Sequence, residues 1–342
     1  MLPRKSPVSQ QDIDAGGATE SRLAPVQVRP APSAVWRAKP APQAQARSKP
    51  STKPPAVSVV IPTLNEARNL EHVLPALPEA LHEVILVDGG SSDDTLEVAQ
   101  RLRPSIRITR QTRSGKGNAL ACGFAASSGD IIVMLDADGS ADPDEIMRFV
   151  DALVDGADFA KGSRFLAGGG SADITRIRSL GNRCLGLLVN LGFRSAYTDL
   201  CYGYNAFWAA TCLPVLELEW TAPAPEDGDG RLWGDGFEIE TLINIRVAEA
   251  GLNVVEVPSF ELSRRHGVSN LNAPRDGLRV LRTIITEYRS ARARRRMRRF
   301  ESRQQPMAAD ERTTTRRERV HVPRDARRPQ PRGLSRLRQL LM

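Results

Sequence analysis

Three short runs of β-branched and aliphatic residues, each followed by a polar loop, constrain the fold of this chain more than any other feature. The runs cover 57–61, 83–87 and 131–135, and segments of helical length lie at 66–77, 92–102 and 116–128. Continuous apolar runs are typical of strands buried on both faces of a sheet, and their alternation with helices is typical of parallel βαβ units. The sequence therefore predicts an α/β fold with a mostly parallel central sheet flanked by helices, and with functional loops at the carboxyl ends of the strands.

Further along the chain the pattern is looser. The expected elements are a flexible hinge at Gly168–Gly170, a helix over 176–193, a polar loop over 219–231, a helix near 236–250, a strand over 253–257 and a helix around 275–290. Two helix starts carry capping signals. We interpret Ser92 as the cap of the second helix, and Asp142 with Glu145 as a cap around Pro143 rather than as site residues.

Charge is distributed unevenly along the chain. Residues 1–55 carry 9 Lys and Arg against 3 acidic residues, and residues 289–342 carry 18 Arg against 5, whereas 56–288 has a net charge of −11. Neither end has the apolar periodicity that offsets the entropy of ordering. We therefore predict a disordered, Pro-rich basic extension over 1–55, one folded domain over 56–288, and a disordered Arg-rich tail over 289–342.

Several classes of protein are disfavoured by what the sequence lacks. The four cysteines form no C-x-x-C pair, which argues against a zinc site or a disulfide framework and favours a reducing cytoplasm. The start of the sequence does not resemble a signal peptide, and no run approaches 18 apolar residues. Any contact with a membrane is therefore expected to be peripheral.

The strongest chemical signal is the pair Asp136 and Asp138, directly after the third apolar run. Residues two apart on an extended backbone face the same side. Two carboxylates about 6 Å apart repel by roughly 3 kcal/mol at an effective dielectric constant of about 20, so a cation is expected between them. Hard oxygen ligands suit Mg²⁺ or Mn²⁺. The alternative is that the two acids merely end a strand in a loop.

The stretch Ser114–Asn118 contains Gly115, Lys116 and Gly117. It is not a Walker A loop, because Lys116 is followed by Gly rather than Ser or Thr, and it is not a dinucleotide fingerprint, because Leu120 occupies the third glycine position. Two interpretations remain. Lys116 at a helix N-terminus binds an anion, or the stretch is a plain turn.

Polar residues also follow the first two strands. Pro62, Asn65 and Glu66 follow the first, and Asp88 follows the second. Because parallel strands end at one edge of a sheet, these groups are placed to contact a nucleobase and its ribose. Each of them alone is equally compatible with a cap.

Taken in order, P-x-x-N-E, V-D-x-G-S-x-D-x-T, G-K-G-x-A and D-A-D resemble the motifs of family 2 glycosyltransferases of the GT-A fold. Later motifs at Gly162–Arg164, Asp199–Gly203, Gly234–Glu240 and Arg264–Ser269 are similar to the polyprenyl-phosphate sugar synthase branch, typified by dolichyl-phosphate mannose synthase. The resemblance covers about 57–272. It implies that 56–288 is a catalytic domain of the GT-A nucleotide-diphospho-sugar transferase fold.

The resemblance also implies roles for individual residues. Asp136 and Asp138 would bind Mg²⁺ or Mn²⁺, with Asp136 facing the ribose and diphosphate and Asp138 the principal ligand. The nucleoside pocket would be lined by Pro62, Asn65, Glu66 and Asp88, with Lys116 joining the donor-binding set; phosphates would be held by Arg164, Arg264 and Ser269; Asp199 and Glu240 would lie near the sugar and acceptor. Departures from the family pattern at Gly89, Ser140, Tyr202 and Asn270 leave the base, the sugar and the choice of metal open.

The predicted reaction is metal-dependent, inverting transfer of a sugar from a GDP- or UDP-sugar to a polyprenyl phosphate. The metal and the arginines stabilise the charge on the departing nucleoside diphosphate. A lipid phosphate needs no general base, whereas a hydroxyl acceptor needs one, for which Asp199 is the first candidate. The alternatives are transfer to a saccharide or small-molecule hydroxyl, and a non-catalytic scaffold recruited through the Arg-rich tail.

Two segments predict where the protein acts. The helix expected over 176–193 mixes leucines with arginines, which fits either an interfacial helix facing a lipid or a helix packed on the sheet. The run Arg292–Arg299 favours an anionic membrane over nucleic acid, although a solubilising tail is a further alternative. We therefore expect a cytoplasmic enzyme held peripherally at the inner face of the plasma membrane. The sequence does not indicate an oligomeric state.

Overall fold

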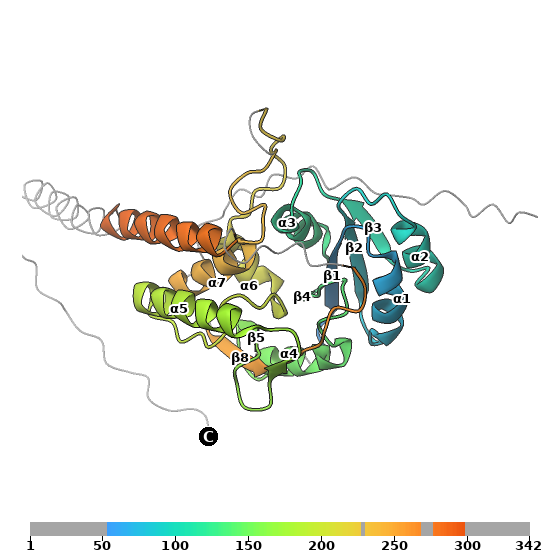
Figure 1. The fold of residues 1–342 in the computed structure, drawn as a ribbon, viewed down its shortest axis with the longest axis horizontal. Helices are drawn as coiled ribbons and strands as arrows, with labels where there is room; N and C mark the ends of the chain where they lie inside the picture. Colours follow the sequence, from blue (N-terminus) through green and yellow to red (C-terminus); the bar gives the residue numbers. More distant parts are fainter. Residues whose placement is uncertain (1–52, 227–229, 268–275, 298–342) are drawn as a thin grey trace, which may run out of the picture. The chain divides into compact units, whose positions relative to one another are not determined.

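The computed structural model describes residues 53–226, 230–267 and 276–297 (Figure 1). The chain divides into two compact units, 1–288 and 289–342. Most of both predicted disordered ends lies outside the described residues. The helix expected around 275–290 is described over 276–297, so the first residues of the predicted tail are helical rather than disordered.

The first unit contains one large sheet, one two-stranded ribbon and helices around them. The strands are β1 (Val57–Thr63), β2 (Glu83–Asp88), β3 (Arg107–Arg110), β4 (Ile131–Met134), β5 (Phe159–Ser163), β6 (Gly170–Ser171), β7 (Asn205–Trp208), β8 (Val254–Pro258) and β9 (Phe260–Glu261). The helices are α1 (Ala67–Ala76), α2 (Thr95–Leu102), α3 (Lys116–Ala126), the 3₁₀ turn η1 (Pro143–Glu145), α4 (Ile146–Val154), α5 (Arg176–Phe193), α6 (Ala209–Leu216) and α7 (Ile239–Glu249).

The large sheet has the order β3-β2-β1-β4-β7-β5-β8, and β7 is its one antiparallel strand in the described part of the chain. The chain first builds outward from β1 through β2 to β3, and then returns to the other side of β1 as β4. The order of the strands therefore reverses between β1 and β4. In open α/β sheets, ligands bind at such a point, outside the carboxyl ends of the strands.

Two hydrophobic clusters cover the two faces of the sheet. Alternate residues of β1 divide between them, so Val59 and Ile61 pack with α1, α2 and α4, while Val60 packs with α3, α6 and α7. Burial on both faces explains why β1, β2 and β4 read as continuous apolar runs rather than alternating ones. The predicted α/β class is confirmed.

Three local predictions require correction. Ser92 caps no helix, because α2 begins at Thr95 and Ser92 instead donates its backbone N–H to Asn65 Oδ1 (2.7 Å). Asp142 does cap η1 by accepting from Asp144 N (3.0 Å), but Glu145 turns away and accepts from Ser259 and from Phe260 N. The predicted hinge at Gly168–Gly170 is instead partly β-structure, since Gly170 pairs with Phe260 in the β6–β9 ribbon.

Candidate active site

The ends of β1 and β2 lie side by side in the sheet. Pro62 lies in β1 beside Val87 of β2, and Thr63 lies beside Asp88. Asn65 adopts a left-handed conformation (φ 56°), which Asn tolerates better than most residues, and its side chain joins the two loops through Ser92. The structure therefore brings Pro62, Asn65 and Asp88 together, as predicted for a nucleoside pocket.

Within the described part of the chain, one carboxylate oxygen of Asp88 accepts a hydrogen bond, and the other does not. Its Oδ1 accepts from Ser91 N (2.9 Å), while no hydrogen bond from the described residues reaches the buried Oδ2. Arg110 Nε approaches that oxygen at 3.7 Å, which is an electrostatic contact rather than a hydrogen bond. A buried acceptor without a donor costs free energy, so this oxygen is suited to receive an N–H group from a ligand.

Asp136 and Asp138 follow β4 at the point where the strand order reverses. Asp136 contacts Lys116 Nζ through both oxygens, at 2.8 and 2.9 Å, and its side chain is 37% exposed. Asp138 Oδ1 accepts from the backbone N (3.0 Å) and hydroxyl (2.6 Å) of Ser140, and its Oδ2 lies 3.1 Å from Arg264 Nη2. Each acid of the pair therefore has its own basic neighbour, Lys116 at Asp136 and Arg264 at Asp138.

Lys116 is shared between two carboxylates. Its ammonium group contacts Asp136 and also Glu240 Oε1 (2.6 Å). Burial opposes the charged lysine, but the charges of Asp136 and Glu240 outweigh burial and raise the pKa of Lys116. Burial also raises the pKa of Glu240, and Lys116 counteracts this in part. Lys116 thereby links Glu240 to Asp136, and the position of Glu240 near the sugar stays a prediction.

The glycines around Lys116 serve packing rather than phosphate binding. A Cβ atom at Gly115, whose φ is +119°, would lie 2.2 Å from Asp235 O, and one at Gly117 would lie 1.8 Å from Gly234 O. The same Asp235 carbonyl accepts from Gly117 N (2.7 Å) and Asn118 N (3.4 Å). The backbone N–H groups of Gly117 and Asn118 at the N-terminus of α3 therefore already have an acceptor. The Lys116 side chain is the counter-ion of Asp136 and Glu240 in the structure, and its binding of the donor stays a prediction.

Asp235 is a residue that the sequence analysis missed. Its carboxylate forms a buried bidentate pair with Arg113, at 2.7 and 2.9 Å, and accepts from Leu232 N (2.7 Å). Arg113 also donates to the carbonyls of Glu219 and Ala222. The pair fixes the loop that caps α3 and thereby the direction of Lys116. Arg113 and Asp235 are 122 residues apart, so no local pattern indicates the contact.

Arg264 bridges the two halves of the site. Its guanidinium lies 3.0 Å from Glu66 Oε1 and 3.1 Å from Asp138 Oδ2. The structure therefore joins the loop after β1 to the loop after β4 through the predicted phosphate-binding segment. Ser269, the last predicted member of that segment, lies outside the described residues.

The donor set of Asp136 and Asp138 fits a hard divalent cation. Both offer carboxylate oxygens, and both side chains are partly exposed to solvent. Among the residues that the structure describes, no three His, Cys, Asp or Glu side chains converge as a metal cluster. Mg²⁺ or Mn²⁺ would therefore take its remaining ligands from phosphate oxygens and water, as is common for Mg²⁺.

In the structure, Arg164 and Asp199 are paired with each other. Arg164 donates to Asp199 from Nε (2.7 Å) and Nη2 (3.0 Å), and to Glu261 from Nη1 (3.0 Å). Burial tends to raise the pKa of Asp199, but the hydrogen bonds and charge of Arg164 lower it overall. A buried carboxylate held in this way is a poor general base, and Arg164 has its charge matched by acids rather than available for a phosphate.

A cavity of about 350 Å³, shallow and wide open to solvent, lies along the start of α5. It is lined by Ile174, Thr175, Arg176, Ser179, Leu180 and Arg183. The Arg183 guanidinium lies 5.7 Å from the ring of Phe165, which directly follows Arg164 at the end of β5. The cavity is therefore close to the carboxyl end of β5 and combines two arginines with apolar side chains.

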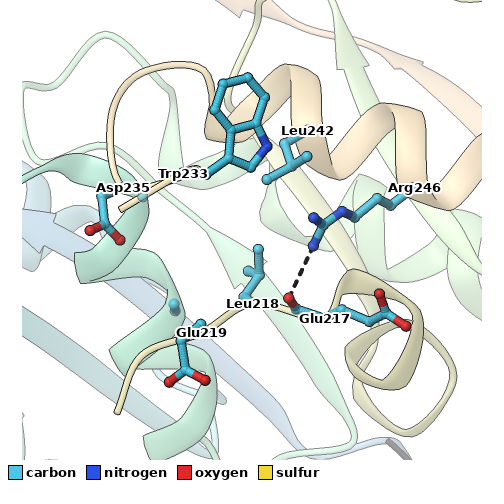
Figure 2. A pocket seen from close by; sticks show the side chains of 10 residues that line it. Glu217, Leu218, Glu219, Trp233, Asp235, Leu242 and Arg246 are labelled. Carbon is cyan, nitrogen blue, oxygen red and sulfur yellow. Dashed lines mark hydrogen bonds between the residues drawn. The ribbon is translucent and has the colours of Figure 1, made fainter. Parts of the chain in front are cut away.

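A second cavity, of about 60 Å³, is lined by α3, by α7, by the loop after α6 and by the segment 233–235 (Figure 2). Figure 2 shows Arg246 of α7 reaching toward Glu217, whose carbonyl accepts its guanidinium N–H (3.0 Å). Ligand pockets usually enclose about 300 Å³ or more. This cavity is therefore too small for a nucleotide sugar.

One face of α5 exposes large apolar side chains. Ile177 is 81% exposed and Leu191 is 73% exposed, and Leu180, Leu187 and Leu188 lie between them on the same helix. The opposite face is buried through residues that include Val189. Within the three described ranges, every helix is either too short or too polar to cross a lipid bilayer.

Comparisons with known proteins show the family to which this chain belongs. The family model described as Glycosyl transferase family 2 matches residues 58–208. Glycosyltransferase AglJ of Haloferax volcanii is 30% identical over 227 residues, which cover 66% of this chain and 69% of that protein. An undecaprenyl-phosphate mannosyltransferase of Micrococcus luteus is 32% identical over 225 residues, which cover 63% of this chain and 87% of the relative.

Among solved structures, glucosyl-3-phosphoglycerate synthase from Mycobacterium tuberculosis, in complex with Mn²⁺, UDP and glucosyl-3-phosphoglycerate, matches with a TM-score of 0.51. The sequences are 23% identical, and the match covers 68% of this chain and 80% of that one. Fold and relatives together define a glycosyltransferase of the GT-A fold. The chain belongs to glycosyl transferase family 2, and the predicted resemblance to its polyprenyl-phosphate branch is confirmed.

Proposed function

We propose that this enzyme transfers a sugar from a nucleotide-sugar donor to a polyprenyl phosphate, with inversion at the anomeric carbon. The observation that carries this proposal is the cavity at the start of α5, where Arg176 and Arg183 lie together with Ile174 and Leu180. Guanidinium groups match phosphate, and apolar side chains match the hydrocarbon beside it. Leu180 belongs both to the cavity and to the exposed apolar face of α5. The name of the Micrococcus luteus relative supports the same acceptor class.

The donor binds, in this proposal, at the ends of β1, β2 and β4. The unsatisfied Oδ2 of Asp88 accepts an N–H group of the base, and Asn65 and Glu66 lie in the neighbouring loop after β1. Asp136 and Asp138 hold Mg²⁺ or Mn²⁺ with the diphosphate. Crystals of glucosyl-3-phosphoglycerate synthase contain UDP with Mn²⁺ in one case and with Mg²⁺ in another, which supports a divalent ion of either kind.

The reaction follows from the charges. A phosphate oxygen of the acceptor attacks the anomeric carbon while the bond from that carbon to the diphosphate breaks. The acceptor is already an anion, so no side chain has to remove a proton, and the commitment of Asp199 to Arg164 is consistent with this. The metal ion, when bound, neutralises negative charge on the departing nucleoside diphosphate. Glu240 and Lys116 shape the floor of the sugar site, where Gly203 lies against both.

We also propose that the enzyme works peripherally at the inner face of the plasma membrane. The exposed side chains of α5 recur at helical spacing from Ile177 to Leu191, so they form one apolar face. Arginines flank that face at Arg176, Arg183 and Arg194. An apolar helix face bordered by cations suits an anionic lipid surface. The acceptor then reaches the cavity from the lipid side.

A donor and acceptor screen tests the function. UDP- and GDP-sugars are incubated with undecaprenyl phosphate, undecaprenol or 3-phosphoglycerate in the presence of Mg²⁺ or Mn²⁺. We expect transfer to undecaprenyl phosphate only, lost in Asp138→Ala. Preferential transfer to undecaprenol or to 3-phosphoglycerate would show that the acceptor is not a polyprenyl phosphate. The absence of turnover with every donor would favour a non-catalytic scaffold.

A variant of the cavity at the start of α5 tests the acceptor site. Arg183→Gln should raise the KM for the lipid phosphate without changing slow hydrolysis of the donor.

A further inference from the structure

Arg264 pairs with Asp138, one of the two carboxylates that would hold a metal ion. Of the two Asp138 oxygens, Oδ1 is taken by the backbone N–H and hydroxyl of Ser140, and Oδ2 faces the Arg264 guanidinium at 3.1 Å. The same guanidinium is held from the other side by Glu66 at 3.0 Å. Its side chain is 25% exposed, so the ion pair is partly shielded from water.

The backbone around Arg264 keeps the guanidinium in this position. Leu262 N donates to Ser140 O (2.8 Å), and Arg265 N donates to Asp138 O (3.3 Å). On the other side, Asn69 Nδ2 of α1 donates to His266 O (3.2 Å). The backbone of 262–267 is therefore tied both to the Asp136–Asp138 loop and to α1, which places Arg264 between Glu66 and Asp138.

We propose that Arg264 is an internal counter-ion of the metal site, which a divalent ion displaces from Asp138 and which then pairs with the diphosphate of the donor. The proposal rests on the proposed function, because it assumes a donor with a diphosphate. A guanidinium and a metal ion compete for the same carboxylate oxygen, so each weakens the binding of the other. Diphosphate oxygens offer the displaced guanidinium a bidentate partner of the kind it prefers.

The competition couples the two ligands. A metal ion that binds alone must break the contact between Arg264 and Asp138, whereas one that binds with a nucleoside diphosphate finds Arg264 already drawn to the phosphates. Each ligand therefore strengthens the binding of the other, and the coupling is reciprocal. Lys116 is less readily displaced from Asp136, because it is also paired with the buried Glu240.

The test measures the binding of Mn²⁺ itself, by calorimetry and by the loss of the free-ion signal in electron paramagnetic resonance. Full-length wild type, Arg264→Gln and Arg265→Gln are compared without nucleotide and with saturating UDP or GDP. Arg265→Gln is the matched control, since it removes the same charge one residue away, beside Gly139. Arg264→Gln should bind Mn²⁺ alone about two- to fivefold more tightly than the control, the range expected for one partly exposed ion pair.

With a nucleoside diphosphate present, the Mn²⁺ affinities of the variants should converge. The factor by which the nucleotide strengthens Mn²⁺ binding should therefore be about two- to fivefold smaller in Arg264→Gln than in the control. Arg264→Lys should lie between wild type and Arg264→Gln, because it keeps the charge but cannot bridge Glu66 and Asp138 with a planar fork. Equal Mn²⁺ affinity in Arg264→Gln and Arg265→Gln, or weaker binding in Arg264→Gln, would overturn the inference. Failure of the proposed function is distinct from this: no variant would bind UDP or GDP at all, with or without Mn²⁺.

Discussion

At the scale of single residues, Lys116 is the side chain on which most of the site's charge balance depends. It is the shared counter-ion of Asp136 and Glu240, and Glu240 is buried. Removing one partner of a buried pair typically costs about 3–5 kcal/mol, because the other charge stays buried without compensation. We therefore expect Lys116→Met to lower the free energy of unfolding by an amount in this range.

The loss in Lys116→Met should depend on pH. Burial already raises the pKa of Glu240, and without Lys116 it rises further. A carboxyl whose pKa is higher in the folded than in the unfolded state binds more protons in the folded state. The free energy of unfolding therefore falls as pH rises from the unfolded-state pKa to the folded-state pKa. In urea denaturation, the free energy of unfolding of Lys116→Met should therefore lie closer to that of wild type near pH 5 than near pH 8. In the double variant Lys116→Met/Glu240→Gln, the difference from wild type should depend less on pH. An equal deficit at both pH values would contradict the assignment.

Asp199 is expected to behave as a structural partner of Arg164. Asp199 is buried, but Arg164 keeps its pKa low. The ionised carboxylate therefore stabilises the fold above the pKa of Asp in the unfolded chain, about 3.9, and this contribution is lost as pH falls below that value. Asp199→Asn should be less stable at neutral pH and should show a shallower loss of stability in acid. Below its unfolding temperature, Asp199→Asn should still transfer sugar to the lipid phosphate. Loss of turnover in the folded variant would indicate that Asp199 acts as a general base.

At the scale of elements, α5 has one buried face and one exposed apolar face. Val189 and other residues pack inward, while Leu187 and Leu191 are exposed. We expect Leu187→Gln/Leu191→Gln to weaken binding to vesicles that contain anionic lipid while leaving the denaturation midpoint unchanged. Sedimentation with vesicles measures the binding, and Val154→Gln, on the exposed side of α4, is the matched control. Equal losses in both variants would exclude α5 as the lipid-facing element.

At the scale of the whole molecule, the compact unit that ends at Tyr288 is expected to carry the chemistry without 289–342. That segment holds 18 arginines and 5 acidic residues, and near an anionic leaflet each arginine contributes about 1 kcal/mol of attraction, without strict additivity. A chain shortened to 1–288 should hydrolyse donor slowly as before, but should lose salt-sensitive vesicle binding and much of its turnover on lipid phosphate. Unchanged turnover on vesicles would assign the tail another role.

The parallel half of the sheet and its site could be predicted because their signals are local. The runs at β1, β2 and β4 are apolar over their whole length, and the polar residues at their carboxyl ends, Asp88 and Asp136 among them, must meet at one sheet edge once the strands are parallel. In contrast, β5 includes the buried Lys161, whose ammonium is satisfied by the carbonyl of Tyr202 at 2.8 Å, and nothing in the local pattern indicates a strand there.

By itself, then, the sequence determined the α/β class, the edge at which the site lies and the acidic pair after β4, since each depends on side chains close together in the chain. Only the tertiary structure decided what neutralises those acids. Lys116 points at Asp136 because Asp235, fixed by Arg113, caps α3, and Asp199 is paired because Arg164 reaches it across 35 residues. A charge is neutralised by whichever group lies nearest in space, and the distance between two groups along the chain does not determine their distance in the fold.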